Sequence, residues 1–421
     1  CNALVSQDYT YGQMTSAKLQ SLLMAVAEYN GSAYAFEDAG TVEPLTRGRG
    51  LSMISQFLQS EAGTANRYND IVAVLKEALA SGGDGTLYVI APNIFVENLG
   101  KKVGDCTFLV FPDGQTMLID AGQGSGVADA GSSNTSQALV GFLHDIGLTK
   151  LDYLVLSHGH GDHYGGMESV VRYLRNDYEK DSNGKAINAF GDITQLTGGA
   201  AGTIGQFWLP GSPVNGQMEG VYSDTTCPTM VEYITTQVGE VRYMFVEESG
   251  ETFDIPVGEG ENQVVVTIFG PTRGDILTVR NGSTGDEQMN NTSICMKVTY
   301  GESTFIACGD TYISQERELV AAFDGTDFLQ ADVVKANHHG NYQSNGQDWV
   351  GAVQPKVFIA EIDGTGSGVV STIVNNAGGV YYTTGFDGAV LVAMEKDGTC
   401  EVTTQYDGVL RKQDVTSQAW K

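Results

Sequence analysis

The sequence is poor in basic residues and lacks several signatures that would fix a function class. Lys and Arg number 23 against 51 Asp and Glu, which gives a formal charge of −28. Domains that hold nucleic acid by bulk charge need the opposite balance, and an anionic membrane surface would repel this chain. No apolar run approaches the roughly 18 residues that span a bilayer. Neither a P-loop nor a G-x-G-x-x-G string after a strand suggests a nucleotide cofactor.

The six cysteines contain no C-x-x-C pair, which argues against a structural zinc knuckle. One pair, Cys295 and Cys308, is separated in sequence but predicted to be close in space. Ser293–Tyr300 and Ser303–Cys308 predict a hairpin around Gly301, and this register sets Cys295 opposite Cys308. Cross-strand neighbours come close enough for a disulfide. A disulfide and two buried free thiols are therefore the two interpretations of this pair.

The remaining composition describes a folded, turn-rich chain. Hydrophobic residues make up 41% of the 421 residues, which is enough for a real core, and the 54 glycines indicate many tight turns between strands. At roughly 150 residues per domain, the length fits two or three domains or one large α/β fold.

Residues 1–85 are predicted to form a helical N-terminal region of unknown role. Three apolar stripes follow the 3-4 spacing of helices, within 19–29, 51–58 and 71–79. The first stripe ends before Asn30-Gly31 and the third before Gly82-Gly83, as helices commonly do.

From Thr86 the pattern changes to short β-rich runs with helices between them. Strands are predicted at 87–96, 107–111, 116–119, 151–156, 264–269, 294–300, 304–307, 331–336, 356–360 and 389–394. Helices are expected at 137–146 and 167–178, and about 181–260 is expected to be loop-rich. Two groups of strands with interspersed helices predict an α/β sandwich of two packed sheets, over residues 86–405, followed by a tail at 406–421.

Five of the six histidines lie in two clusters that follow predicted strands. The first is Ser157-His158-Gly159-His160-Gly161-Asp162-His163, and the second is Asn337-His338-His339-Gly340. Strand ends are where loops gather functional groups on a rigid scaffold. Imidazole and carboxylate together suit Zn²⁺, Mn²⁺ or Fe. The clusters therefore predict a metal site.

The first cluster resembles the H-x-H-x-D-H signature of the metallo-β-lactamase superfamily. Three further strings match: Leu118-Ile119-Asp120-Ala121-Gly122, Ala307-Cys308-Gly309-Asp310, and Lys335 to Gly340 with Ser344 beyond. Within the superfamily, the chain is most similar to the hydrolase domain of ComEC-type competence proteins. Gly104-Asp105-Cys106, Asn290-Asn291-Thr292-Ser293 and Tyr382-Thr383-Thr384-Gly385 support that branch. The resemblance implies an αββα sandwich of two mixed β-sheets flanked by helices.

The resemblance also implies roles for single residues. His158 and His160 would hold one metal, whereas Asp162, His163 and one of His338 and His339 would hold a second. Asp310 would bridge the two. Asp162, with His158 and His160, is assigned to catalysis. The residues expected to support these ligands or contact substrate are Asp120, Asn290, Asn291, Lys335 and Ser344.

One departure concerns the first metal. Most of the superfamily supplies a third histidine between the H-x-H-x-D-H motif and the bridging aspartate, and no histidine occurs between His163 and His338. Asn290-Asn291-Thr292 occupies the matching place. The implied cofactor is therefore one or two divalent ions, Zn²⁺ first and Mn²⁺ as the alternative.

The function implied is a metal-dependent hydrolase, expected to be a phosphodiesterase that uses a metal-bound hydroxide. A secreted or surface nuclease is one form. Alternatives are cleavage of a smaller phosphodiester or ester (phosphocholine, a lipid headgroup, a lactone) and a non-catalytic surface binding protein on the same fold. The expected partner is an anionic ester, with DNA as one candidate, although bulk charge opposes a stable nucleic-acid complex.

The first residue, Cys1, has two interpretations. It is either the lipid-anchored cysteine of a mature bacterial lipoprotein or an arbitrary boundary. Either suits an extracellular or cell-surface location better than the cytoplasm.

Overall fold

The computed structural model describes residues 15–29, 50, 53, 64–94, 104–123, 135–175, 203–222, 226–282, 285–362, 364 and 366–408. The chain divides into two compact units. The first comprises residues 1–69 and 404–421, and the second comprises residues 70–403. Cys1 and most of the apolar stripe at 51–58 lie outside the described residues. No helix in these ranges combines the length and apolarity needed to cross a membrane.

The first unit joins the two ends of the chain through a short antiparallel pair. Strand β1 (Thr64–Asn66) pairs with β18 (Tyr406–Gly408), which belongs to the segment expected to be a tail. Helix α2 (Ser16–Tyr29) buries Leu19, Leu23 and Ala27, as the 3-4 spacing predicts.

The boundary between the units lies at residue 69, not at the expected residue 85. Helix α4 (Tyr68–Ser81) is the reason, since from Asp70 onward it belongs to the second unit. Its apolar face, Ile71, Leu75 and Ala78, is fully buried. The sequence pattern shows that a helix is amphipathic but does not show which neighbour covers its apolar face.

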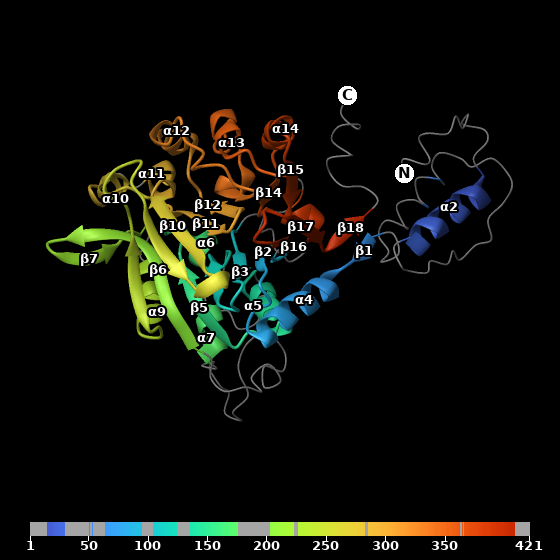
Figure 1. The fold of residues 1–421 in the computed structure, drawn as a ribbon, viewed down its shortest axis with the longest axis horizontal. Helices are drawn as coiled ribbons and strands as arrows, with labels where there is room; N and C mark the ends of the chain where they lie inside the picture. The colour runs from blue at the N-terminus through green and yellow to red at the C-terminus, as the bar shows by residue number, and fades with distance from the viewer. Residues whose placement is uncertain are drawn as a thin grey trace. The chain divides into compact units, whose positions relative to one another are not determined.

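The second unit is built on two mixed β-sheets (Figure 1). The first runs in the order β17-β16-β2-β3-β4-β5-β6-β7, with β8 also paired to β6. Its strands are β2 (Leu87–Ala91), β3 (Thr107–Val110), β4 (Thr116–Ile119), β5 (Lys150–Val155), β6 (Thr203–Val214), β7 (Gln217–Gly220), β8 (Glu240–Met244), β16 (Val390–Met394) and β17 (Cys400–Thr404). Strands β4, β5, β6 and β8 are parallel, and the pairs β16–β2, β2–β3, β3–β4 and β6–β7 are antiparallel.

The second sheet runs in the order β15-β14-β13-β12-β11-β10-β9. Its strands are β9 (Phe253–Val257), β10 (Val264–Gly270), β11 (Cys295–Tyr300), β12 (Ser303–Ala307), β13 (Val333–Lys335), β14 (Val357–Ala360) and β15 (Val380–Thr383). The four strands from β12 to β15 are parallel, and the rest are antiparallel.

The main core lies between the sheets. Alternate residues of the first sheet, such as Val89, Val155 and Trp208, form one cluster with residues of the second sheet, such as Val298 and Phe305, and all of them are buried. Alternation places every second side chain of a strand on the same face. A fully buried side chain of this size contributes about 1.5–3 kcal/mol to stability, so this layer is the main source of rigidity for the loops at its edge.

Helices cover the outer faces, which completes the αββα order expected from the resemblance (Figure 1). Leu319, Trp349 and Val374 belong to three helices that pack in one cluster with Ile306 and Phe358 of the second sheet. Those helices are α12 (Ile313–Ala322), α13 (Gln347–Val353) and α14 (Gly368–Asn376). The others are α5 (Thr135–Asp145), α6 (Gly161–Tyr164), α7 (Met167–Arg175), α9 (Thr226–Thr235), α10 (Arg273–Arg280), α11 (Asp286–Asn290), α15 (Thr384–Asp387), and the 3₁₀ turns η1 (Gly260–Asn262) and η2 (Asn337–Gly340).

The expectation of a loop-rich stretch at 181–260 is wrong for its described part. Strand β6 lies parallel to both β5 and β8, and its Phe207, Trp208 and Leu209 are fully buried. Pro210 and Pro213 argue against a strand here, because proline has no N–H to donate to a neighbouring strand. Pro210 is opposite Met244 at the end of the pairing with β8, and Pro213 lies in the half of β6 that pairs with the short strand β7. Local composition therefore concealed a strand that the tertiary packing stabilises.

The hairpin of β11 and β12 has the predicted register, since Met296 pairs with Ala307. Cys295 and Cys308 are both buried free thiols, so the second of the two interpretations applies in this structure. Burial raises the pKa of the Cys308 thiol well above its ordinary value, and the neighbouring Cys295 raises it further. A neutral, buried thiol is chemically inert.

A candidate metal centre at one edge of the sandwich

The polar residues of the candidate site come from strand ends in both sheets. Asp120 follows β4, the His158–His163 loop follows β5, and Asp310 follows β12. His339 follows β13 in the turn η2. The carboxyl ends of parallel strands meet at one edge of a sheet, and the two sheets present these edges to each other. Residues far apart in sequence thus meet without any of them lying on a long loop.

A carboxylate holds the His163 ring through one nitrogen, while the other nitrogen faces Asp310. Its Nδ1 atom lies 2.7 Å from Oδ2 of Asp120, and its Nε2 atom lies 3.1 Å from Oδ2 of Asp310. Asp120 itself accepts from the Ser157 backbone N–H at 2.7 Å and the Ser157 hydroxyl at 2.6 Å. Burial would lower the pKa of His163, but Asp310, Asp120 and Asp162 raise it well above its ordinary value. Asp120 therefore orients the His163 ring through its Nδ1 atom.

His339 is arranged in the same way from the other sheet. Its Nδ1 atom lies 2.7 Å from Oδ1 of Asp105. Its Nε2 atom lies 3.1 Å from Oδ2 of Asp162 and 3.2 Å from Oδ2 of Asp310. Both histidines therefore turn Nε2 toward the same oxygen. Burial would raise the pKa of Asp310, but the two imidazoles hold it well below its ordinary value.

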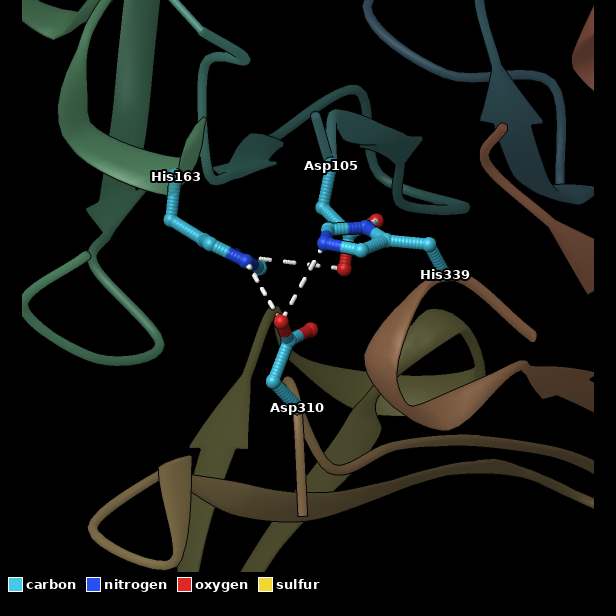
Figure 2. A group of neighbouring side chains, drawn as sticks. All are labelled: Asp105, His163, Asp310 and His339. Carbon is cyan, nitrogen blue, oxygen red and sulfur yellow. Dashed lines mark hydrogen bonds and ion pairs between the residues drawn. The ribbon is translucent and has the colours of Figure 1, made fainter. Parts of the chain in front are cut away.

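Asp105, His163, Asp310 and His339 form a compact, buried group (Figure 2). Each offers one ligand atom, and these four atoms all lie within 4.8 Å of one another. His163 Nε2 and Asp310 Oδ1 are buried atoms without a hydrogen-bond partner. Buried polar atoms are normally satisfied, and two imidazoles with carboxylates are a donor set for Zn²⁺ or Mn²⁺. The residues present therefore fit a divalent metal.

His158 and His160 converge beside this group. The Nε2 atom of His158 lies 3.0 Å from the Nδ1 atom of His160. Burial lowers the pKa of both imidazoles, and the neighbouring His163 lowers it further. Neutral imidazole is the form that ligates metal. The structure thus brings together His158 and His160 in one pair, and Asp162, His163, Asp310 and His339 in another set.

The structure separates the two histidines of the doublet. His338 does not join the buried group; its ring stacks on Tyr312 with centroids 4.9 Å apart. His339 faces the carboxylates instead. Both residues have left-handed backbones, with φ of 47° and 54°, which turns successive side chains in different directions.

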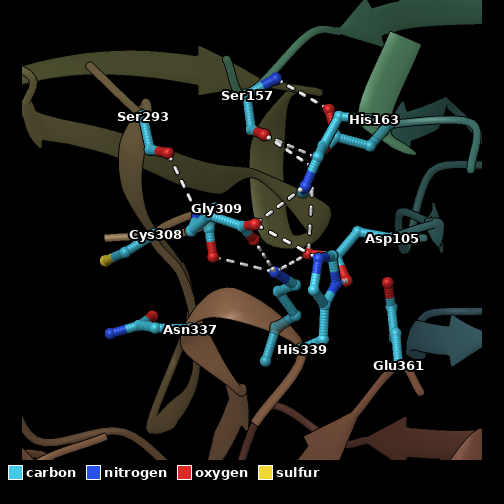
Figure 3. Close-up of polar contacts among 12 residues, drawn as sticks. Asp105, Ser157, His163, Ser293, Cys308, Gly309, Asn337, His339 and Glu361 are labelled. Atoms are coloured by element: carbon cyan, nitrogen blue, oxygen red, sulfur yellow. Dashed lines mark hydrogen bonds and ion pairs between the residues drawn. The ribbon is translucent and has the colours of Figure 1, made fainter. Parts of the chain in front are cut away.

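Lys335 forms a buried ion pair with Asp105. Asp105 lies beside both His163 and His339 (Figure 3). The Lys335 ammonium also donates to the Gly309 carbonyl at 2.9 Å and lies 3.8 Å from Oδ1 of Asp310. Burial lowers the pKa of Lys335 to about 8, and the nearby Glu361 opposes that change. Gly309 is left-handed with φ of 51°, and a Cβ atom there would lie 2.5 Å from the Ser293 hydroxyl oxygen, so glycine fits the space beside Ser293.

The other predicted support residues have more local positions. Asn291 accepts from the Tyr312 backbone N–H at 3.0 Å and donates to Ser314 at 3.3 Å, so it ties two loops together. Asn290 is buried and its Oδ1 atom has no hydrogen-bond partner, as is true of Ser344 Oγ. None of the three is among the four residues of the buried group.

Sequence reasoning assigned no site role to two acids, Glu361 and Asp105, although Asp105 stands in one of the strings that support the resemblance. Glu361 directly follows β14 and accepts from the Cys106 backbone N–H and the Thr107 hydroxyl, both at 2.5 Å. It therefore holds the segment that carries Asp105. Both acids lie beside a strand end, Glu361 after β14 and Asp105 before β3, and this position is a possible signal of a functional residue. Isolated acids in loops are too common for such a signal to select them.

Fold and site together define an αββα sandwich that carries a buried metal-ligand set at one edge of its sheets. Residues 99–182 match the sequence profile of the metallo-beta-lactamase superfamily. This match and the two mixed sheets confirm the expected resemblance to the metallo-β-lactamase superfamily.

Individual relatives are more distant. ComE operon protein 3 of Bacillus subtilis (strain 168) is 27% identical over 117 residues, which are 26% of this chain and 15% of that protein. Among solved structures, CmlA, a diiron beta-hydroxylase from Streptomyces venezuelae, is 13% identical with a TM-score of 0.40, over 86% of this chain and 60% of that one. A long form RNase Z from yeast is 8% identical with a TM-score of 0.43, over 80% and 52%. The chain thus spans less than two thirds of each of these proteins.

Proposed function

We propose that the protein is a metal-dependent phosphodiesterase. The observation that carries this proposal is the pair of buried histidines that face Asp310, each fixed through its other nitrogen by a separate carboxylate. Pre-oriented ligands of this kind are typical of metal sites whose function requires a fixed geometry. A divalent ion held there would supply Lewis acidity for an ester oxygen and would make a water molecule more acidic.

The ligands assigned by this proposal are His163, His339 and Asp310, with Asp162 completing the set. His158 and His160 are assigned to a second ion beside them. Asp120 and Asp105 orient the two buried imidazoles. Zn²⁺ is the proposed ion, and Mn²⁺ is the alternative.

Asp162 is the group best placed to act on the attacking water. Its side chain is 22% exposed, whereas those of Asp105 and Asp310 are at most 2% exposed. Burial would raise its pKa, but His163 and His339 hold it below its ordinary value. An ionised carboxylate that reaches solvent accepts a hydrogen bond from water and orients it. Asp162 would thus orient a water molecule for attack, and the proton released by that water would pass to solvent, because the lowered pKa of Asp162 disfavours its protonation.

A small phosphodiester is favoured over a long nucleic acid by the charge beside the site. Asp286 is exposed, and its charge acts on both His160 and Tyr312. Burial raises the pKa of Tyr312, and Asp286, Asp310 and Glu287 raise it further. Together with the overall charge of −28, this acidic rim disfavours extended contact with a polyanion. A secreted or surface nuclease remains the second candidate, supported by the similarity to ComE operon protein 3.

The experiment that tests the proposal is a substrate panel assayed with Zn²⁺ and with Mn²⁺. It comprises bis-p-nitrophenyl phosphate, a phosphocholine ester, single- and double-stranded DNA, and a β-lactam. We expect metal-dependent cleavage of the small phosphodiesters, with DNA cleaved more slowly. Cleavage of the β-lactam alone would contradict the proposal.

A further inference from the structure

The loop that carries His339 has an unusual backbone. His338, His339 and Gly340 are successive left-handed residues, with φ of 47°, 54° and 78°, and Asn345 is left-handed at 61°. Residues other than glycine adopt this conformation at an energetic cost, so it persists only where the surroundings hold it. The position of the His339 ring depends directly on these angles. Some other part of the molecule must therefore hold the loop in place.

Glu316 of α12 is placed to do so. Its side chain is 1% exposed and accepts three N–H groups from both ends of the loop. These are the Asn337 side-chain amide at 2.8 Å, the Asn345 backbone at 2.5 Å and the Gly346 backbone at 2.8 Å. One carboxylate thus joins the residue before the histidine doublet to two residues beyond it.

Asn345 closes the loop from the inside. Its side-chain oxygen accepts the Asn337 backbone N–H at 2.9 Å, and its amide donates to the carbonyls of Asn337 at 2.8 Å and Asn341 at 3.1 Å. Glu316 and Asn345 therefore bind the same two ends of the loop. No atom of Glu316 is bonded to His163, Asp310 or His339, so any effect on them passes through the loop.

A buried carboxylate whose bonds all go to N–H groups is costly, because those groups replace water incompletely. Asp332 provides a contrast at the opposite end of β13. It accepts from Thr304 and is paired with the Lys356 ammonium at 2.7 Å. Glu316 has no such salt bridge among the described residues. A cost of this kind is retained where it supports function.

We propose that Glu316 is a positioning residue of the metal centre: with Asn345 it clamps residues 337–346 and thereby sets His339 Nε2 opposite Asp310. This inference rests on the proposed metal centre. Without the clamp, the left-handed residues relax toward ordinary angles, and the imidazole no longer meets the other ligands. The clamp thus acts on metal affinity, whatever the substrate.

The test measures Zn²⁺ affinity by competition with a chromophoric chelator at pH 8, on the full chain, for three variants. Glu316→Gln replaces one acceptor with a donor that faces an N–H group. Asn345→Gly keeps the left-handed backbone, which glycine adopts freely, but removes all three side-chain bonds. Asp332→Asn is the matched control, a buried carboxylate beside the same strand but away from the loop.

We expect Glu316→Gln and Asn345→Gly each to bind Zn²⁺ about tenfold more weakly, at the lower end of effects seen for residues that support ligands. Asp332→Asn should bind as the parent does, although it unfolds at a lower temperature. Equal affinity of the parent and both clamp variants would overturn the inference, as would an equal loss in Asp332→Asn. Asn345→Gly keeps the test decisive if Glu316→Gln does not fold.

Failure of the clamp and failure of the proposed function give different results. The measurement uses no substrate. Asp310→Asn gives the Zn²⁺ affinity that is expected when the metal centre is lost. If the parent binds Zn²⁺ but hydrolyses nothing, the proposed function fails and the clamp stands. If the parent binds and hydrolyses while the clamp variants bind equally well, only the clamp fails.

Discussion

The Nδ1 atom of His339 lies 2.7 Å from Oδ1 of Asp105, a residue 234 positions earlier in the chain. This bond fixes which nitrogen of the ring faces Asp310. Asp120 performs the same task for His163. Each sheet therefore contributes one histidine to the site, and a different carboxylate orients each histidine.

Asp105→Asn tests this relationship. The amide oxygen can still accept from His339, but the charge that pairs with Lys335 is lost and the bond to the ring weakens. We expect Zn²⁺ affinity to fall about 10–100-fold, measured by competition with a chelator. The far-ultraviolet circular dichroism should not change. Unaltered affinity would show that Asp105 is not needed to orient the ring.

The two residues of the doublet should behave differently. His339→Ala removes a nitrogen that faces Asp310, so we expect at least a 100-fold loss of metal affinity. His338→Ala removes a ring that stacks on Tyr312, and affinity should stay within about threefold, below the range for residues that support ligands. Elemental analysis of the two purified variants, beside a titration, provides the measurement. The reverse order would assign the ligand to His338.

Removing the metal should destabilise the fold. A ligand that binds only the folded state stabilises it by about 2.7 kcal/mol at 100 times its Kd. The melting temperature should therefore fall when EDTA is added and recover with excess Zn²⁺. In Asp310→Asn the shift should vanish, because Asp310 faces both histidines. A parent protein that melts identically with and without chelator would argue against the centre.

The layer between the sheets should dominate stability. Phe305 is fully buried there, and Phe305→Ala should lower the free energy of unfolding by about 3–5 kcal/mol. Val369, which is 62% exposed, is the control: Val369→Ala should change it by less than about 0.5 kcal/mol. Urea unfolding measures both. A loss below about 1 kcal/mol for Phe305→Ala would place the main core elsewhere.

Glu316 should make stability depend on pH. Burial raises its pKa to about 7 from an ordinary 4.5, although the N–H groups it binds oppose this. Between these values the folded chain holds a proton that the unfolded chain has released. Its contribution is therefore fully present below about pH 4.5 and falls as the pH rises to about 7, by up to about 3 kcal/mol.

Glu316→Gln removes this titration. Urea unfolding of the parent and the variant in EDTA should show the parent losing stability relative to the variant between pH 5 and pH 8. A difference that stays constant over this range would mean that Glu316 titrates normally. Other titrating groups, the histidines included, cancel in the comparison because both proteins carry them.

Much of this architecture could be predicted from sequence because its signals are local. The strands before His158 and His338 are apolar runs, and their ends carry residue types that few structural roles demand together. Strand β6 was missed because Gly205, Pro210, Gly211 and Pro213 resemble a loop, whereas its stability comes from β5 and β8 on either side.

The supporting residues depend on distant partners, which sequence does not reveal. Glu361 bonds to Cys106 across 255 positions, and Glu316 reaches Asn345 across 29. Apart from the strand end before Glu361, nothing in their immediate neighbourhood distinguishes them from surface acids. The choice between His338 and His339 depended on two left-handed φ angles, which the adjacent glycine alone does not specify. The ligand roles of His158, His160 and Asp162 remain predictions that affinity measurements can test.

The central claim is that this edge of the sandwich hydrolyses phosphodiesters with a metal held by Asp310 and its neighbours. The most direct test compares turnover of bis-p-nitrophenyl phosphate by the parent, His160→Ala and Asp310→Asn, each stripped with chelator and reloaded with Zn²⁺ or Mn²⁺. The account predicts that the parent is inactive when stripped and active when reloaded, and that both variants lose activity at least 100-fold while remaining folded. Turnover that survives chelation, or equals the parent's in Asp310→Asn, would contradict it.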